Sequence, residues 1–104
     1  MRIEQTHHVD ASEQGTDGKY DWYYEYDIFR FTEGERTLIA RSYTDTSTEA
    51  HFLRFEVQTE PAFILTEDIT NPLLRQAAEY LRSIGKVGIE YLGPEGYAPL
   101  PTEA

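Results

Sequence analysis

Residues 20–31, YDWYYEYDIFRF, carry the strongest signal for a β-strand in the chain, because their residue types alternate as they do in a strand. Successive side chains of a strand point to opposite faces of the sheet. Up to residue 28, the even-numbered face holds only aromatic and aliphatic residues, namely Tyr20, Trp22, Tyr24, Tyr26 and Ile28. The odd-numbered face is richer in carboxylates, with Asp21, Tyr23, Glu25 and Asp27. We therefore predict a strand whose even-numbered face packs into the core.

A glycine after this strand predicts a β-hairpin. Gly34 can take the positive φ that closes a three-residue loop over residues 32–34. With this loop, apolar residues lie opposite apolar residues on one face, Ile28 with Leu38 and Tyr26 with Ala40. On the other face an acid lies opposite a base, Glu25 with Arg41. The next strand is expected over about residues 35–43.

Further strands are predicted on both sides of this hairpin. The turn TDTSTE, residues 44–49, leads into a strand over residues 50–58, and a four-residue loop pairs Leu38 with Phe55 and Ala40 with Leu53. Residues 2–9 carry a weak signal for an edge strand, and residues 87–93 alternate as a last strand. Residues 62–65, AFIL, fit either a short strand or a buried connector.

One helix is predicted over about residues 72–84. Asn71 is suited to the N-cap, Pro72 to the first helical position, and Gly85 to the end. The apolar stripe consists of Leu73, Leu74, Ala77, Leu81 and Ile84. The predicted fold class is therefore α+β, an antiparallel meander of four to five strands with one main helix packed on one face, across Trp22, Tyr24 and Leu53.

Composition predicts one cytoplasmic domain over residues 1–104, with a mobile loop over residues 10–19 and a flexible C-terminal tail over residues 97–104. The chain lacks cysteine, an apolar run long enough to span a membrane, and the apolar core of a secretory signal. Its formal net charge of −10 disfavours direct binding to nucleic acid or anionic lipid. The same charge favours encounter with a basic protein partner.

The sequence gives no support for a catalytic, metal or cofactor site. Neither a nucleophile elbow nor a phosphate-binding glycine loop is present. His51 lies at the margin of the predicted core near Ser42, where a hydrogen-bonded packing role is favoured over catalysis. An enzyme is therefore the less favoured class.

The sheet face opposite the predicted core is unusually aromatic and rich in arginine, which is typical of a protein interface. The predicted interface residues are Asp21, Tyr23, Glu25, Asp27, Ile39, Arg41, Tyr43, Phe52 and Arg54. We expect a non-catalytic interaction module, such as an inhibitor, an immunity-type protein or an adaptor, that binds a basic partner. One alternative is a small-molecule binding protein or minor enzyme with a pocket between helix and sheet, lined by Trp22, Tyr24, Tyr26 and His51. Another is a homodimeric structural domain that pairs through this face or its first strand.

Overall fold

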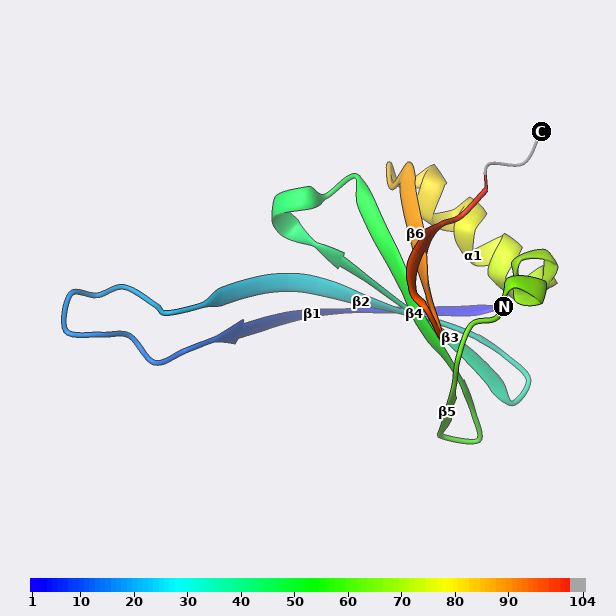
Figure 1. Cartoon of the computed structure of the whole chain (residues 1–104), viewed down its shortest axis with the longest axis horizontal. Coiled ribbons are helices and arrows are strands. Elements are labelled where there is room, and N and C mark those ends of the chain that lie inside the picture. The colour runs from blue at the N-terminus through cyan, green and yellow to red at the C-terminus, as the bar shows by residue number, and fades with distance from the viewer. Residues whose placement is uncertain (102–104) are drawn as a thin grey trace.

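One mixed sheet with an α-helix on one face organises the chain, and the computed structural model describes residues 1–101 (Figure 1). The strands in this part of the chain are β1 (Arg2–Ala11), β2 (Tyr23–Glu33), β3 (Arg36–Tyr43), β4 (Glu49–Val57), β5 (Glu60–Ala62), β6 (Gly88–Gly93) and β7 (Gly96–Pro99). The helices are α1 (Pro72–Ser83) and the short 3-10 helices η1 (Thr44–Thr46) and η2 (Thr66–Thr70). The strand order is β1-β2-β3-β4-β6-β7, and β5 pairs with β4.

The α+β prediction is confirmed, but the sheet has seven strands among the described residues and is not all antiparallel. β4 and β6 are parallel, because β5, η2 and α1 carry the chain back before β6 begins. The meander of four to five strands was therefore wrong. The sequence analysis missed β5 and β7, which are three and four residues long and contain Pro61 and Pro99. Proline is tolerated in such short edge strands.

The register of the β2–β3 hairpin differs from the predicted one. Its loop holds two residues, with Gly34 at φ +62°, and Glu33 pairs with Arg36. Leu38 therefore pairs with Phe31 instead of Ile28, which pairs with Arg41. This shift of three residues exchanges the faces of β2, so that its odd-numbered residues lie on the side of α1.

The core is built from phenylalanine and not from the tyrosines of β2. The largest side chains that it buries almost completely are Phe29, Phe31, Phe52, Phe55, Leu38, Ile64, Leu74 and Leu81. Trp22 and Tyr24, predicted to lie under the helix, are 50% and 51% exposed. The observed arrangement avoids burying the hydroxyl groups of the β2 tyrosines, whereas a phenylalanine ring has no polar atom to satisfy.

The β3–β4 pairing confirms one predicted pair and corrects another. Leu38 lies opposite Phe55 as expected, but an irregularity between Ile39 and Ala40 places Phe52 opposite Ala40. Leu53 is the extra residue of this β-bulge. The bulge adds Phe52 to the core and leaves Leu53 on the sheet face away from α1, which we call the outward face.

Helix α1 lies close to its predicted bounds. The Asn71 side chain accepts a hydrogen bond from the backbone N–H of Leu73 at 2.9 Å, as an N-cap does. After the helix, Gly85 has a φ of +94°. Ala78 adds to the predicted buried stripe, whereas Ile84 is 45% exposed because it lies at the C-cap, beyond the last helical turn.

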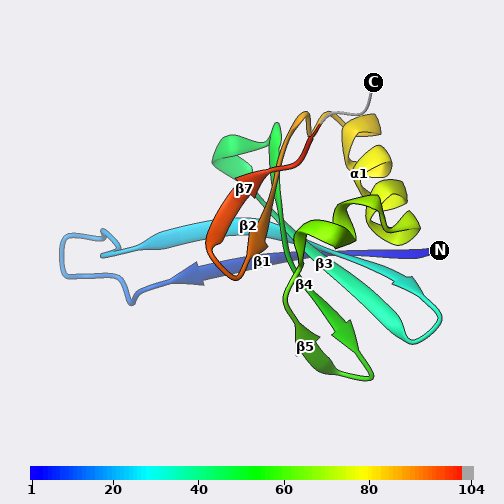
Figure 2. The ribbon, with the colours of Figure 1, turned by 45° about the vertical axis from the view of Figure 1, so that its right-hand side comes forward.

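The β1–β2 hairpin projects from the body of the molecule (Figures 1 and 2). β2 pairs with β3 only up to Tyr26, and beyond this point β1 and β2 pair only with each other within the part of the chain that the structure describes. We call residues 9–25 the arm. Residues 10–19 were predicted to form a mobile loop, but Asp10 and Ala11 belong to β1.

The predicted C-terminal tail is partly structured. Residues 97–99 lie in β7, which pairs with β6, and Leu100 is buried to 9% exposure. The end of this predicted tail, residues 102–104, lies outside the described residues.

Candidate functional site

The arm exposes a cluster of aromatic side chains. Its rings are those of Tyr20, Trp22, Tyr23 and Tyr24, and each is between 46% and 51% exposed. The rings of Tyr20 and Tyr23 lie in contact, with their centroids 5.4 Å apart. Several large rings grouped on one projecting element are informative, whereas single exposed apolar residues are ordinary.

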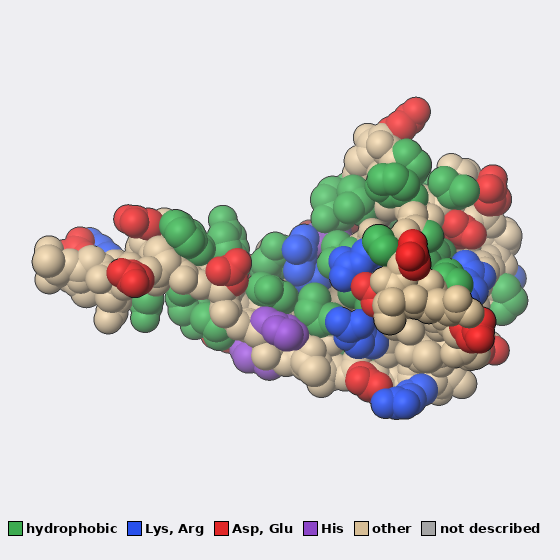
Figure 3. All heavy atoms as spheres, turned by 90° about the horizontal axis from the view of Figure 1, so that it is seen from below, with side chains coloured by type: hydrophobic (Ala, Val, Ile, Leu, Met, Phe, Trp, Pro, Cys, Tyr) green, Lys and Arg blue, Asp and Glu red, His purple; other side chains and the backbone are tan. Residues whose placement is uncertain are grey.

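The arm is also acidic. Its carboxylates are Asp10, Glu13, Asp17, Asp21 and Glu25, and Lys19 is its one lysine or arginine. In the space-filling view, apolar and acidic side chains lie along the arm among other surface, whereas most basic side chains on this face gather on the body (Figure 3). The negative charges of the arm therefore lie beside its exposed rings, where they can attract a cation.

A small notch lies at the base of the arm, where β3 ends and β2 continues beside β1. Its volume is about 200 Å³, and its lining comprises Tyr23, Tyr24, Glu25, Tyr43, Thr44 and Asp45. η1 follows Tyr43 and folds back toward β2, so that Thr44 donates a side-chain hydrogen bond to the backbone carbonyl of Glu25 at 3.3 Å. This bond ties the η1 side of the notch to the arm.

The notch combines aromatic rings with carboxylates. The ring centroids of Tyr24 and Tyr43 are 6.1 Å apart, and the Tyr23 hydroxyl donates to Glu25 Oε1 at 2.9 Å. This hydrogen bond raises the pKa of Tyr23, because it favours the protonated phenol beside a carboxylate. Aromatic faces and carboxylates together favour a cationic group such as the ammonium of lysine or the guanidinium of arginine.

His7 lies between two carboxylates on the α1 side of the hairpin. Its Nδ1 is 2.6 Å from Asp27 Oδ1, and its Nε2 is 3.3 Å from Glu25 Oε2. The hydrogen bond with Asp27, opposed by partial desolvation but assisted by both negative charges, raises the pKa of His7 above 6.5. His7 is therefore coupled electrostatically both to Asp27 and to Glu25 of the arm.

This coupling predicts a pH-dependent stability. Because folding raises the pKa of His7, its protonated ring stabilises the folded state below pH 6.5, and this contribution is lost as the pH rises through the folded-state pKa. The His7→Gln variant should therefore be destabilised relative to wild type at about pH 6, and less so in alkaline buffer. Thermal unfolding of both proteins over a pH series checks this. In an Asp27→Asn background the pH-dependent difference should shrink; an unchanged difference would contradict the assigned cause.

The outward face carries a second group of aromatic and basic residues. Arg41 lies over the ring of Tyr43 at 4.8 Å and donates to the Tyr97 hydroxyl at 3.4 Å. The rings of His51 and Tyr97 are 5.1 Å apart, and His51 Nε2 is 3.2 Å from Glu90 Oε1. A hollow of about 410 Å³ lies beside them, lined by Arg41, Leu53, Arg54, Pro61, Ala62, Phe63, Leu92 and Tyr97.

The predicted interface residues do not form one surface. Tyr23, Glu25 and Tyr43 meet at the notch, and Arg41 and Arg54 line the outward hollow. Asp21 lies in the arm loop, and Asp27 binds His7. Phe52 and Ile39 are 0% and 1% exposed, so their assignment to an exposed face was wrong. Phe52 lies in the core, and Ile39 lies between Arg30 and Arg54, whose aliphatic stems can cover it.

The pocket predicted between helix and sheet is not formed by its proposed residues. Trp22 and Tyr24 lie in the arm, while Tyr26 and His51 lie on the outward face. The sequence analysis also missed Thr44 and Asp45, which reach the notch only because η1 folds back toward β2. The available signal for this part of the notch was Asp45, an acidic residue that follows the strand predicted over residues 35–43.

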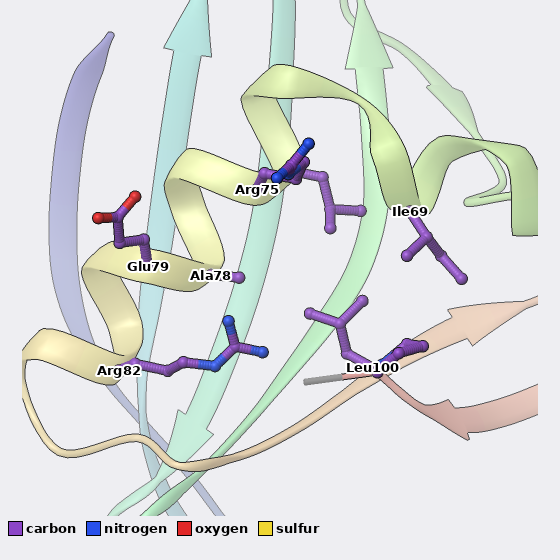
Figure 4. A pocket seen from close by; sticks show the side chains of 8 residues that line it. Ile69, Arg75, Ala78, Glu79, Arg82 and Leu100 are labelled. Atoms are coloured by element: carbon purple, nitrogen blue, oxygen red, sulfur yellow. The ribbon is translucent and has the colours of Figure 1, made fainter. Parts of the chain in front are cut away.

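A further hollow, of about 270 Å³, lies between α1 and the segment around Leu100 (Figure 4). It is lined by Ile69, Leu74, Arg75, Ala78, Glu79, Arg82, Leu100 and Pro101, and it includes none of the predicted site residues. Within residues 1–101, no three His, Asp or Glu side chains are grouped as metal ligands. Over the same residues, no helix is both long and apolar enough to cross a membrane.

Comparisons of the chain with protein-family models, with curated proteins and with solved structures gave no significant match. The geometry of the arm, the notch and the outward hollow is therefore the basis for the functional proposal.

Proposed function

We propose that this protein is a small, non-catalytic interaction module that binds a basic protein partner through its arm. The observation that carries the proposal is the group of half-exposed rings among five carboxylates on one projecting hairpin. Aromatic residues supply much of the binding energy at interfaces, and a surplus of one charge attracts a partner of the other. Inhibitors, immunity-type proteins and adaptors all work in this way.

The notch gives the proposal a specific contact. A lysine or arginine side chain entering it would meet the carboxylates of Glu25 and Asp45 and the rings of Tyr24 and Tyr43. Charge-assisted hydrogen bonds to the carboxylates would orient the cation, and the rings would cover its apolar stem. The remaining acids of the arm would speed the encounter at low ionic strength.

Calorimetric titration with an arginine-rich peptide tests the proposal. The double variant Glu25→Gln and Asp45→Asn removes both notch carboxylates, and we expect it to weaken binding by about tenfold or more. The matched control is Glu60→Gln with Glu67→Gln, which removes the same charge at exposed positions away from the notch. Binding should also weaken as salt is added. Equal weakening by both double variants, or no binding by the wild type, would contradict the proposal.

Small-molecule binding is a second candidate, at the outward hollow instead of the helix–sheet interface. The observation that favours it is Arg41 Nε, which is buried without a hydrogen-bond partner among the described residues, in a side chain that lines this hollow. A hollow with two arginines and apolar walls suits a carboxylate on an aromatic ring. NMR titration with benzoate should then shift signals of Arg41 and Tyr97, and Arg41→Gln should abolish the shifts. Shifts that persist in this variant, or none in the wild type, would exclude this candidate.

A further inference from the structure

Among residues 1–101, no strand pairs with the outer edge of the first strand of the sheet. β1 pairs with β2 on one side and ends the strand order, and its residues other than Ile3 and Ala11 are exposed. Such an edge presents a row of free backbone N–H and C=O groups, which another strand can bind. β1 is ten residues long and has neither a proline nor a bulge in its pairing with β2, so it lacks two devices that commonly protect edges.

Two copies of β1 can be aligned antiparallel with Thr6 opposite Thr6, and in this register the opposed side chains are complementary. The pairs that result are Arg2 with Asp10, Glu4 with His8, Ile3 with Val9 and Gln5 with His7. Thr6 then lies opposite its own copy. Residues directly opposite each other in an antiparallel pair share a face, so the first two pairs would lie on the outward face and the other two on the α1 face.

Neighbouring registers lose this complementarity. A shift of two residues in one direction places Glu4 opposite Asp10, a pair of like charges. The same shift in the other direction places Arg2 opposite His8, and no residue of the second β1 then lies opposite Asp10. The register centred on Thr6 is therefore favoured by charge and by apolar pairing together.

We propose that the protein forms a symmetric homodimer by antiparallel pairing of β1 with β1 of a second copy, centred on Thr6. The two-fold axis passes through the Thr6 pair perpendicular to the sheet, and it joins the sheets of both copies into one. In each copy Arg2, which in the monomer pairs with Glu4, gains Asp10 of the other copy as a partner.

The dimer adds to the proposed function without depending on it. β1 runs from the body toward the arm, so the two arms would project in opposite directions (Figure 2). The notch lies on the β2 side of the arm, next to η1, and the dimer would leave it open in both copies. Two arms on one dimer could then engage two basic sites on a partner.

Cysteine cross-linking tests the register directly, because the chain has no cysteine of its own. Thr6→Cys places the only thiol opposite its own copy, whereas Gln5→Cys places it opposite His7. Both positions are exposed, and each substitution removes one exposed side-chain hydrogen bond. Under mild oxidation we expect Thr6→Cys to form a disulfide-linked dimer at least about tenfold faster than Gln5→Cys. Equal rates, or faster linking of Gln5→Cys, would overturn the proposal.

A charge exchange provides the second test. In sedimentation equilibrium, Arg2→Asp alone and Asp10→Arg alone should each weaken dimerisation by about tenfold, because both symmetry-related pairs become like-charged. The variant with both changes should recover most of the wild-type affinity. A wild type that stays monomeric at all concentrations, or a double variant as weak as the singles, would overturn the proposal. Because peptide binding is measured separately, failure of the dimer leaves the proposed function of the arm intact.

Discussion

Replacing Phe52 by alanine is expected to lower the free energy of unfolding by about 3–5 kcal/mol. Phe52 is 0% exposed and lies opposite Ala40, where its ring contacts that of Phe31 at 6.4 Å between centroids. The truncated side chain would leave a cavity that the surrounding rings fill only in part. Urea unfolding followed by circular dichroism measures the change.

The control for this prediction is Trp22→Ala, which removes a larger aromatic ring from the arm. Trp22 is 50% exposed and lies outside the core cluster, so we expect a loss of less than about 1 kcal/mol. A Trp22→Ala loss as large as that of Phe52→Ala would contradict the observed assignment of the faces. Such a loss would instead agree with the sequence prediction, in which Trp22 and the even-numbered tyrosines of residues 20–31 pack into the core.

Leu81→Ala is the second change with a large expected effect, a loss of about 2–5 kcal/mol in unfolding free energy. Leu81 is 0% exposed on the buried face of α1. Its removal would weaken the contact between the helix and the phenylalanines of the sheet. Chemical unfolding of the purified variant at constant temperature gives the value.

Ile84→Ala is the matched comparison, because it removes the same number of carbon atoms from the end of the same helix. Ile84 is 45% exposed at the C-cap, and we expect its truncation to cost less than about 1 kcal/mol. Both residues belong to the apolar stripe predicted from spacing. Equal losses would show that Ile84 packs as the spacing predicts and not as the structure places it.

The helix could be predicted closely because its signals are local. Asn71, Pro72 and Gly85 act through backbone geometry within a few residues of their own position. The alternation of β2 is equally local, and it correctly predicts a strand. Neither signal depends on which other segments pack against it.

The choice of faces and the pairing could not be obtained from alternation alone. Rings occur at both even and odd positions of β2, so hydrophobicity does not say which set lies inside. The distinction lies in the hydroxyl group: Phe29 and Phe31 are buried, whereas Tyr23 and Tyr24 keep contact with water. The sequence analysis weighted the run of tyrosines and tryptophan over the shorter pair of phenylalanines, and this inverted the sheet.

For a related reason, the sequence predicted only part of the candidate site. Tyr23, Glu25 and Tyr43 were selected as aromatic and acidic neighbours, and the structure brings them to one notch. Thr44 and Asp45 lie in the turn that was predicted over residues 44–49, but the sequence did not show that this turn lies beside β2 and completes the notch. The parallel pairing of β4 and β6 is likewise a non-local result, since it depends on how α1 covers the sheet.

Fluorescence of Trp22 reports whether a basic partner binds at the arm, because this single tryptophan of the chain lies there. Adding an arginine-rich peptide at low salt should change its emission until saturation. The change should disappear at high salt and be absent with an acidic peptide of equal length. If the arginine-rich peptide binds by calorimetry while the Trp22 emission stays constant, the partner binds elsewhere and the proposed role of the arm is wrong.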